Sequence, residues 1–248
     1  MAKKVTYILV LAAFFTFPLA AQEEAESSAV DSVFSAGAGG FIGGDFGGGA
    51  ESTASAEGQS ATMKTEMPYF GGGGYVFFDA KYAELTLGIY GGSGKAKYEF
   101  TVNGESNSNS SYDISFGYFN IGLLGKYPFA VNQKFSVFPL LGIEYDVCFS
   151  AKDEDGNEYK NMDGKDSPGD FSALWFKFGV GGDVALTQRV YLRLEALYGF
   201  RLASKAEKDA KDSFDSMFTE MDVASTDVDS KTLLGHGLTA KLAVGYKF

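Results

Sequence analysis

The stretch Leu238 to Phe248, LTAKLAVGYKF, decides the fold because apolar residues occupy every second position up to the last residue. A period of two is typical of a β-strand with two unlike faces. The apolar face carries Leu238, Ala240, Leu242, Val244, Tyr246 and Phe248, and the opposite face carries Thr239, Lys241 and Lys247. Such an apolar face either covers the core of a water-soluble protein or contacts lipid on the outside of a membrane barrel. One strand is compatible with both interpretations, so other segments have to separate them.

The N-terminus has the pattern of a cleaved export signal. Lys3 and Lys4 precede an apolar run over residues 5–19, and small residues end this signal at Ala21. The run is shorter than the roughly 20 residues that a membrane-spanning helix requires. We therefore predict an exported chain with a signal peptide at residues 1–21, a short segment at 22–31 and one domain at 32–248.

Composition excludes several classes of function. The chain has 21 Lys and Arg against 32 Asp and Glu, a formal charge of -11, and loss of the two signal lysines gives -11 - 2 = -13. Such a surface repels phosphate backbones, so no nucleic-acid partner is expected. The only cysteine, Cys148, excludes an internal disulfide, and one Cys with one His excludes Cys/His zinc sites. We expect no cofactor and no metal.

Period-two segments bounded by turn residues predict eight strands. They fall near residues 32–46, 68–80, 82–98, 112–127, 134–149, 171–186, 189–202 and 234–248. The connections alternate, with long ones at 47–67, 103–111, 151–170 and 203–233 and short ones between. In an up-and-down barrel this order puts the short turns and both termini on one side and the long loops on the other. The predicted fold is all-β, an eight-stranded antiparallel up-and-down transmembrane β-barrel.

The face opposite the apolar one carries charge on most strands. In the segment 190–202, Arg193, Glu195 and Arg201 alternate with apolar residues. A charge in a sealed apolar core would cost several kcal/mol unless paired, so this face has to contact solvent or a polar lumen. Because eight strands enclose a space that side chains can fill, we predict a plugged, salt-bridged lumen rather than an open pore. Its candidate residues are Glu84, Lys126, Glu144, Asp146, Lys177, Asp183, Arg193, Glu195, Arg201 and Lys241.

The segment 112–127 departs from this regularity. Ile114, Phe116 and Tyr118 are in one phase of the alternation, whereas Phe119 and the apolar residues after it are in the other. A β-bulge near Tyr118 would explain the change, and so would a different register.

With its export signal, eight amphipathic strands, alternating connections and aromatic ending, the chain from Val33 to Phe248 resembles the small outer-membrane β-barrels of the OmpA, OmpX and opacity-protein type. The resemblance implies insertion into the cell outer membrane, with short periplasmic turns and long extracellular loops. In this family the final strand is a recognition signal for the barrel-assembly machinery, and the matching residues here are Leu242, Val244, Tyr246 and Phe248. The implied partners are outer-membrane lipid and that machinery, and no single activity is implied.

His236 is the only histidine and lies at the loop end of the last predicted strand. Some barrels of this size modify lipid A with a His and a Ser, and in the deacylase pattern the Ser follows two residues after the His. Leu238 occupies that position. We therefore predict an interfacial residue and a protein that is not an enzyme. The acidic segment Asp153 to Glu158 lacks the ligand spacing of a calcium loop and is interpreted as a solvated loop.

The longest connection is predicted to contain a helix over Lys205 to Met221. Ser204 and Glu207 have the spacing of a capping box at its start. Phe214, Met217, Phe218 and Met221 share one helical face. This face either packs on the barrel rim or forms an interaction patch.

The function expected from the sequence is structural or adhesion-like, through acidic extracellular loops that contact a host or envelope ligand, in a protein that is a monomer. Two alternatives remain open. One is passive transport of small solutes in the manner of OmpW-like barrels, and the other is a soluble exported barrel that binds a ligand as lipocalins do.

Overall fold

The computed structural model describes residues 34–56, 58–160, 166–202, 204–220 and 227–248. The predicted signal peptide (1–21), the segment 22–31 and Met221 lie outside these residues, and so does the side chain of Phe218. The strands are β1 (Phe34–Ala56), β2 (Gln59–Glu66), β3 (Tyr69–Ala80), β4 (Ala83–Val102), β5 (Glu105–Lys126), β6 (Phe129–Ala130), β7 (Phe135–Lys152), β8 (Ala173–Ala185), β9 (Val190–Arg201) and β10 (Asp227–Lys247). A short 3-10 helix, η1 (Pro168–Phe171), and the helix α2 (Lys205–Glu220) complete the fold.

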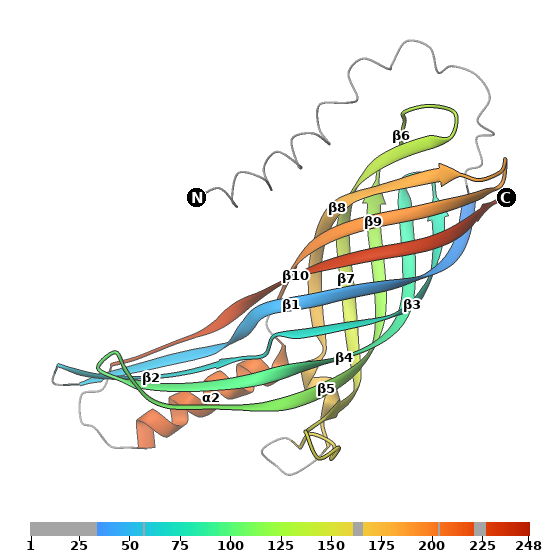
Figure 1. Cartoon of the computed structure of the whole chain (residues 1–248). Coiled ribbons are helices and arrows are strands. Elements are labelled where there is room, and N and C mark those ends of the chain that lie inside the picture. Colours follow the sequence, from blue (N-terminus) through green and yellow to red (C-terminus); the bar gives the residue numbers. More distant parts are fainter. Residues whose placement is uncertain (1–33, 57, 161–165, 203, 221–226) are drawn as a thin grey trace.

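Eight of these strands form a closed antiparallel ring, as the sequence predicts. The order around the ring is β1, β3, β4, β5, β7, β8, β9 and β10, and β10 pairs with β1 to close it. Ser35 lies opposite Lys247 at one end of the closing pair, and Ser55 lies opposite Asp227 at the other. Closure removes the free sheet edges that an open sheet would present to lipid. Figure 1 shows the ring as an upright barrel.

The outward face of the barrel is apolar and the inward face is charged. Leu242, Val244 and Ile143 are all about half exposed on the outside. Arg193, Glu84 and Lys241 are buried inside. A soluble barrel that binds a ligand in its interior requires the inverse arrangement, so the exposure pattern is that of a membrane barrel.

Two of the connections predicted as loops are largely strand, and a third ends in strand. Residues 47–56 continue β1, and β2 pairs with them over Gly49 to Ala56. The predicted long connection 103–111 contains only a tight turn at Asn103 and Gly104, both with positive φ, and β5 begins directly after it. In the third connection β10 begins at Asp227. The prediction of polar loops was wrong here because polar side chains also suit a sheet that has one face in water and a polar helix contact on the other.

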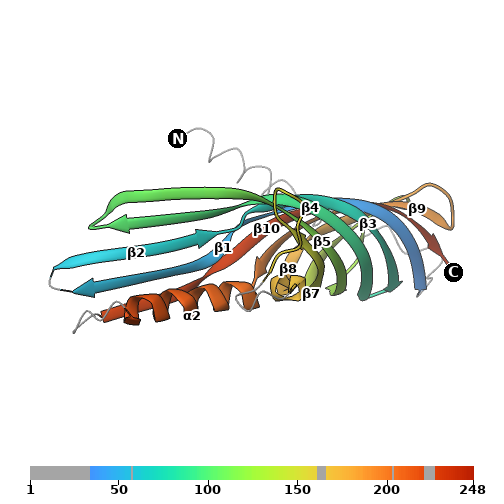
Figure 2. The same ribbon diagram turned by 90° about the horizontal axis from the view of Figure 1, so that it is seen from below.

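These extensions form a sheet of β10, β1, β2, β4 and β5 that projects beyond the barrel, which we call the platform. Figure 2 shows α2 lying along one face of the platform. The other face carries opposite charges on neighbouring strands: Lys231 pairs with Glu51, Glu51 lies opposite Lys64, and Lys64 lies opposite Glu99. The outward surface therefore changes from apolar to charged where the barrel becomes the platform. This change marks where the lipid-facing surface ends.

The irregular segment in β5 has a simple explanation. A register shift does occur opposite β7, between Gly117 and Tyr118. The alternation of β5 is nevertheless unbroken, because Ile114, Phe116 and Tyr118 point inward, whereas Phe119 faces outward. The apparent change of phase arises because the lumen is aromatic near the platform and charged further along.

The helix α2 begins as the sequence predicts. The Ser204 backbone N–H donates to Glu207 Oε2 at 2.7 Å, and the Glu207 backbone N–H donates to Ser204 Oγ at 3.3 Å. This reciprocal pair confirms the capping box. Within the part of the chain that the structure describes, neither helix is long and apolar enough to cross a membrane.

Candidate functional site

The ten predicted lumen residues all lie inside the barrel and form three groups along its axis. The group nearest the short turns is centred on Arg193. Its guanidinium contacts Asp79 at 2.7 Å and Asp183 at 2.8 Å and also binds Glu84. Lys126 binds the same Asp79. The ring of Phe77 lies 4.5 Å from the Arg193 guanidinium, so the cation is held by carboxylates and by an aromatic face.

The middle group joins strands across the lumen. Lys177 binds Glu144, and Lys241 lies 3.8 Å from the same carboxylate. Lys241 is also the register partner of Glu195 on β9. Asp146 accepts a hydrogen bond from the Tyr90 hydroxyl at 2.8 Å. Each charge in this group therefore has a polar neighbour on another strand.

The third group lies where the barrel meets the platform. Arg201 on β9 contacts Asp45 on β1 at 2.9 Å and Glu207 on α2 at 2.6 Å. All three side chains are buried. Because Glu207 also caps its own helix, this group fixes the start of α2 to two barrel strands.

Sequence reasoning missed three members of these groups, Asp45, Asp79 and Glu207. Asp79 lies on the same inward face of β3 as Tyr75 and Phe77. A lumen lined only by polar residues would not include these two aromatic residues, so the inward face of this strand was not recognised. Asp45 lies in a glycine-rich strand, which has too few side chains to show which positions face inward and which face outward. The spacing of Glu207 from Ser204 predicts only its part in the capping box. Following the alternation through aromatic residues would have found Asp79.

Three successive glycines kink β1 beside the third group, and one of them, Gly48, makes room for it. Gly47, Gly48 and Gly49 have φ values of 84°, 79° and 150°, which residues with side chains rarely adopt. A Cβ on Gly48 would lie 2.1 Å from Arg201 Nη2 and 2.9 Å from Glu207 Oε1. The kink therefore lets the Arg201 to Glu207 ion pair pass close to the backbone.

The lumen is filled rather than open. An aromatic cluster occupies its platform end, where Tyr90 stacks on Tyr118 at 4.9 Å and Phe116 contacts Phe171 at 5.2 Å. Between Asp146, Trp175 and Lys177 a cavity of about 30 Å³ remains, roughly the space of one water molecule.

The residues of the predicted assembly signal lie on the outward face of β10 and just beyond it. Leu242, Val244, Tyr246 and Phe248 are exposed there, and the Tyr246 and Phe248 rings contact each other at 5.7 Å. The predicted loop patch is divided. Phe214 is buried on the platform, whereas Met217 is exposed.

His236 and the acidic loop have local roles in the structure. The His236 ring stacks at 6.1 Å on Tyr198 and lies 6.1 Å from Phe46, on the outward face. In the acidic loop, Asp153 Oδ1 accepts the Asn157 backbone N–H at 2.9 Å, and this bond lowers the pKa of Asp153 below its ordinary value. Among the described residues, no cluster of three or more His, Cys, Asp or Glu side chains could hold a metal ion.

No protein-family model matches the chain, and no curated protein matches it. Among solved structures it is similar to the outer membrane protein OprG from Pseudomonas aeruginosa, with 13% identity, a TM-score of 0.35, and 85% of this chain and 96% of that chain covered. It is also similar to the outer membrane protease OmpT from Escherichia coli, with 11% identity, a TM-score of 0.29, and 87% and 96% covered. The likeness to the translocator domain of autotransporter NalP from Neisseria meningitidis has 9% identity, a TM-score of 0.24, and 100% and 98% covered. These likenesses are distant, and the fold rests on the strand pairing described above.

Proposed function

We propose that this chain is an outer-membrane barrel of the small OmpA, OmpX and opacity-protein type that acts without enzymatic chemistry, as a structural or surface-interaction protein. The observation that carries the proposal is the outward surface, which is apolar over the barrel and charged over the platform. Ile42 and Phe46 on β1 are exposed and apolar, and Glu51 follows them on the same strand beyond the glycine kink. A bilayer would surround the apolar barrel surface, and water would surround the charged platform surface.

The platform is the part that faces the outside of the cell in this proposal. Short turns join β3 to β4 and β8 to β9 at the opposite end, and outer-membrane barrels keep such turns in the periplasm. The platform, α2 and the acidic residues of the 151–170 connection would then be the surface that a host or envelope ligand contacts. The barrel would be a monomer that anchors this surface.

Passive transport of small solutes is the second candidate. It requires a path through the lumen, and the ion pairs of Arg193, Lys177 and Arg201 with the aromatic cluster oppose one. A small cavity beside Asp146, lined by both charged and aromatic side chains, is the observation that favours it. Single-channel conductance of the reconstituted chain separates the two candidates.

Location and orientation are tested together on intact cells. An epitope tag inserted at Gly156, in the acidic loop, is expected to bind antibody from outside, whereas a tag at Lys81 in a short turn is the matched control and is expected to bind only after lysis. The purified chain is expected to need detergent and to migrate differently on a gel before and after boiling. A chain found free in the periplasm, or the opposite tag result, contradicts the proposal.

The absence of enzymatic chemistry has a separate test. Expression of the chain is expected to leave the lipid A mass spectrum of the host unchanged. A change that disappears in His236→Ala would establish a lipid A-modifying enzyme instead.

A further inference from the structure

The charged face of the platform, opposite α2, is hollowed over β2, β4 and β5 by a groove of about 350 Å³. We call it the polar groove. The pairing register places Lys97 next to Glu66 and Ser111, and it places Glu99 next to Lys64. The side chains that line the groove on this face are Lys64, Glu66, Lys97, Glu99, Asn109 and Ser111. Strand pairing therefore fixes the floor of the groove.

The polar groove has balanced charge and unused hydrogen-bonding groups. Its two lysines match its two glutamates, and Lys64 Nζ contacts Glu66 Oε1 at 2.6 Å. In the part of the chain that the structure describes, the side chains of Lys97, Asn109 and Ser111 make no hydrogen bond or ion pair. No aliphatic residue is among the described residues that line the groove. Hydroxyl groups, which both donate and accept, suit this lining better than a phosphate, an amine or an acyl chain.

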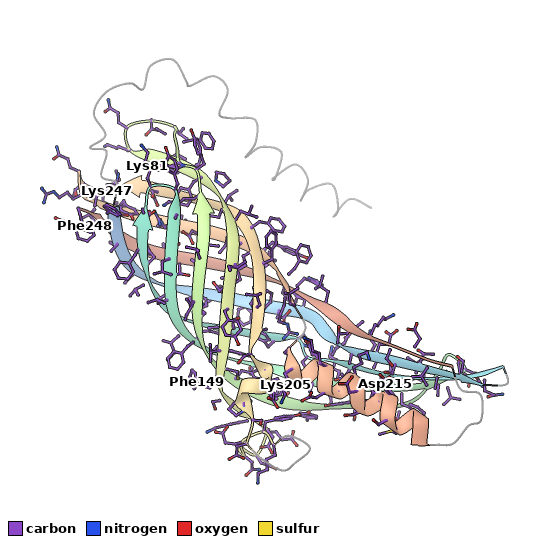
Figure 3. All side chains as sticks on the ribbon, turned by 180° about the vertical axis from the view of Figure 1, so that it is seen from behind. Lys81, Phe149, Lys205, Asp215, Lys247 and Phe248 are labelled. Atoms are coloured by element: carbon purple, nitrogen blue, oxygen red, sulfur yellow. The ribbon has the colours of Figure 1, made fainter. Side chains whose placement is uncertain are left out.

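The polar groove continues the lipid-facing surface of the barrel. On the outward face of β4, Ile89 is half exposed and lies opposite Phe119, whose ring contacts that of Phe149 at 4.6 Å. Figure 3 shows Phe149 at the platform end of the barrel. Aromatic rings of this kind mark the edge of the apolar band in a membrane barrel. Lys97 follows Ile89 on the same face, about 26 Å further along the strand at about 3.3 Å per residue. The groove therefore lies outside the acyl-chain region.

We propose that the polar groove binds the saccharide chain of the glycolipid in the leaflet that surrounds the barrel. The proposal rests on the proposed function and names the envelope ligand of the platform. The outer leaflet of an outer membrane contains glycolipid whose saccharide chains extend beyond the acyl region. Figure 1 shows the platform projecting to one side of the barrel, so the groove lies beside the barrel wall and not above the lumen. A saccharide that is anchored in the surrounding leaflet lies on that side.

The chemistry of the groove fits consecutive sugar rings. Lys97 can donate to a ring or hydroxyl oxygen, Glu99 can accept from a hydroxyl, and the Asn109 amide can do both. Neighbouring strands lie about 4.8 Å apart, so the three strands present polar groups at about the spacing of consecutive rings. Because the lysines and glutamates balance, the groove recognises the hydroxyl groups of the saccharide and not its phosphates.

The test is an NMR titration of the full mature chain in detergent with soluble core oligosaccharide, released from lipopolysaccharide by mild acid and dephosphorylated. The groove variant is Lys97→Ala/Ser111→Ala. The control variant is Lys208→Ala/Ser216→Ala, which removes the same two residue types from the exposed side of α2. The wild type and the control are expected to bind alike. The groove variant is expected to bind about tenfold or more weakly, since loss of one hydrogen bond to a charged group has about that effect.

Equal binding by the groove variant and the control, or no binding by the wild type, overturns the proposal and leaves the membrane location intact. Binding that requires the phosphates of the core also overturns it, because the groove would then be a phosphate site. Tighter binding of N-acetyllactosamine, a saccharide of host cell surfaces, overturns the assignment to the surrounding leaflet. An epitope tag at Gly156 that is not accessible on intact cells contradicts the proposed function itself.

Discussion

Arg193 shows at the scale of one residue how a charge is kept inside a membrane barrel. Its guanidinium has carboxylates on three sides and the rings of Phe77 and Phe138 within 5.1 Å. Because five donors can be shared among three carboxylates, one arginine offsets charges on three other positions of the ring. Its loss would leave several carboxylates buried without their cation.

Arg193→Met is therefore expected to lower the free energy of unfolding by about 3–5 kcal/mol, the cost of leaving buried charges unpaired. Urea unfolding of the barrel in phospholipid vesicles measures it. Lys231→Met, which removes a cation that is 60% exposed and 2.8 Å from Glu51, is the control and is expected to cost about 1 kcal/mol or less. Adding Asp183→Asn to Arg193→Met is expected to restore part of the loss. Equal effects of the two single variants would contradict the lumen network.

At the scale of one element, two polar contacts hold α2 against the sheet, one in its first turn and one two turns later. Its first turn binds Arg201 through Glu207. Further along, Asp215 accepts a hydrogen bond from Ser230 on β10 and pairs with Lys211 at 2.9 Å. Two separate polar contacts with Phe214 buried between them fix the helix to the platform.

Gly48→Ala tests the first contact. The Cβ would displace the Arg201 to Glu207 ion pair, in addition to the strain of a positive φ. Gly58→Ala is the matched control, since Gly58 has the same φ of 79° as Gly48 and open space around it. Hydrogen exchange of the α2 amides is expected to show local opening that is easier by about 1–3 kcal/mol in Gly48→Ala than in Gly58→Ala. Identical exchange in both variants would show that the ion pair does not hold the helix.

The second contact predicts a pH dependence. Burial acts to raise the pKa of Asp215, but hydrogen bonds from Ser230 and Lys211 outweigh it and hold the pKa below the ordinary 3.8. A lowered pKa stabilises the docked helix fully above 3.8, and this contribution is lost as the pH falls through the lower value. Proteolysis of α2 by an acid-active protease is expected to accelerate below about pH 4. Asp215→Asn is expected to remove that acceleration, whereas Asp212→Asn on the exposed side of the helix keeps it.

At the scale of the whole molecule, the barrel and the platform belong to one continuous sheet. The barrel part faces lipid and the platform part faces water. Strands β1, β4, β5 and β10 run from the lipid-facing ring into the platform without a break in pairing other than local shifts. The barrel supplies a filled lumen, and the platform supplies polar surface with α2 on one side, as Figure 1 shows. A rigid connection of this kind would hold the platform in one orientation relative to the membrane.

Planar-bilayer recordings of the reconstituted chain are expected to show no stable single-channel conductance, because ion pairs and aromatic rings fill the lumen. Glu207→Ala, which releases α2 from Arg201, tests whether the helix contributes to the seal. Stable conductance of the unaltered chain would favour the solute-transport alternative. Conductance that appears only in Glu207→Ala would show that α2 closes the mouth.

The sequence alone determined the eight strands of the ring, most of the inward and outward residues and the capping box of α2, because each depends on a period of two or on spacing along one segment. Asp45 and Asp79 are inward carboxylates that alternation of polar with apolar residues does not reveal. The alternation of Val190 to Leu202 specifies both faces of β9 without knowledge of its neighbours. Only the tertiary structure decided that residues 47–56, 59–66 and 105–111 are strand, because polar strands form when a neighbour supplies hydrogen bonds, and a neighbour is not visible in one segment. It alone also brought Asp45, Arg201 and Glu207 together, since Gly48 at positive φ leaves space for a contact between distant parts of the chain.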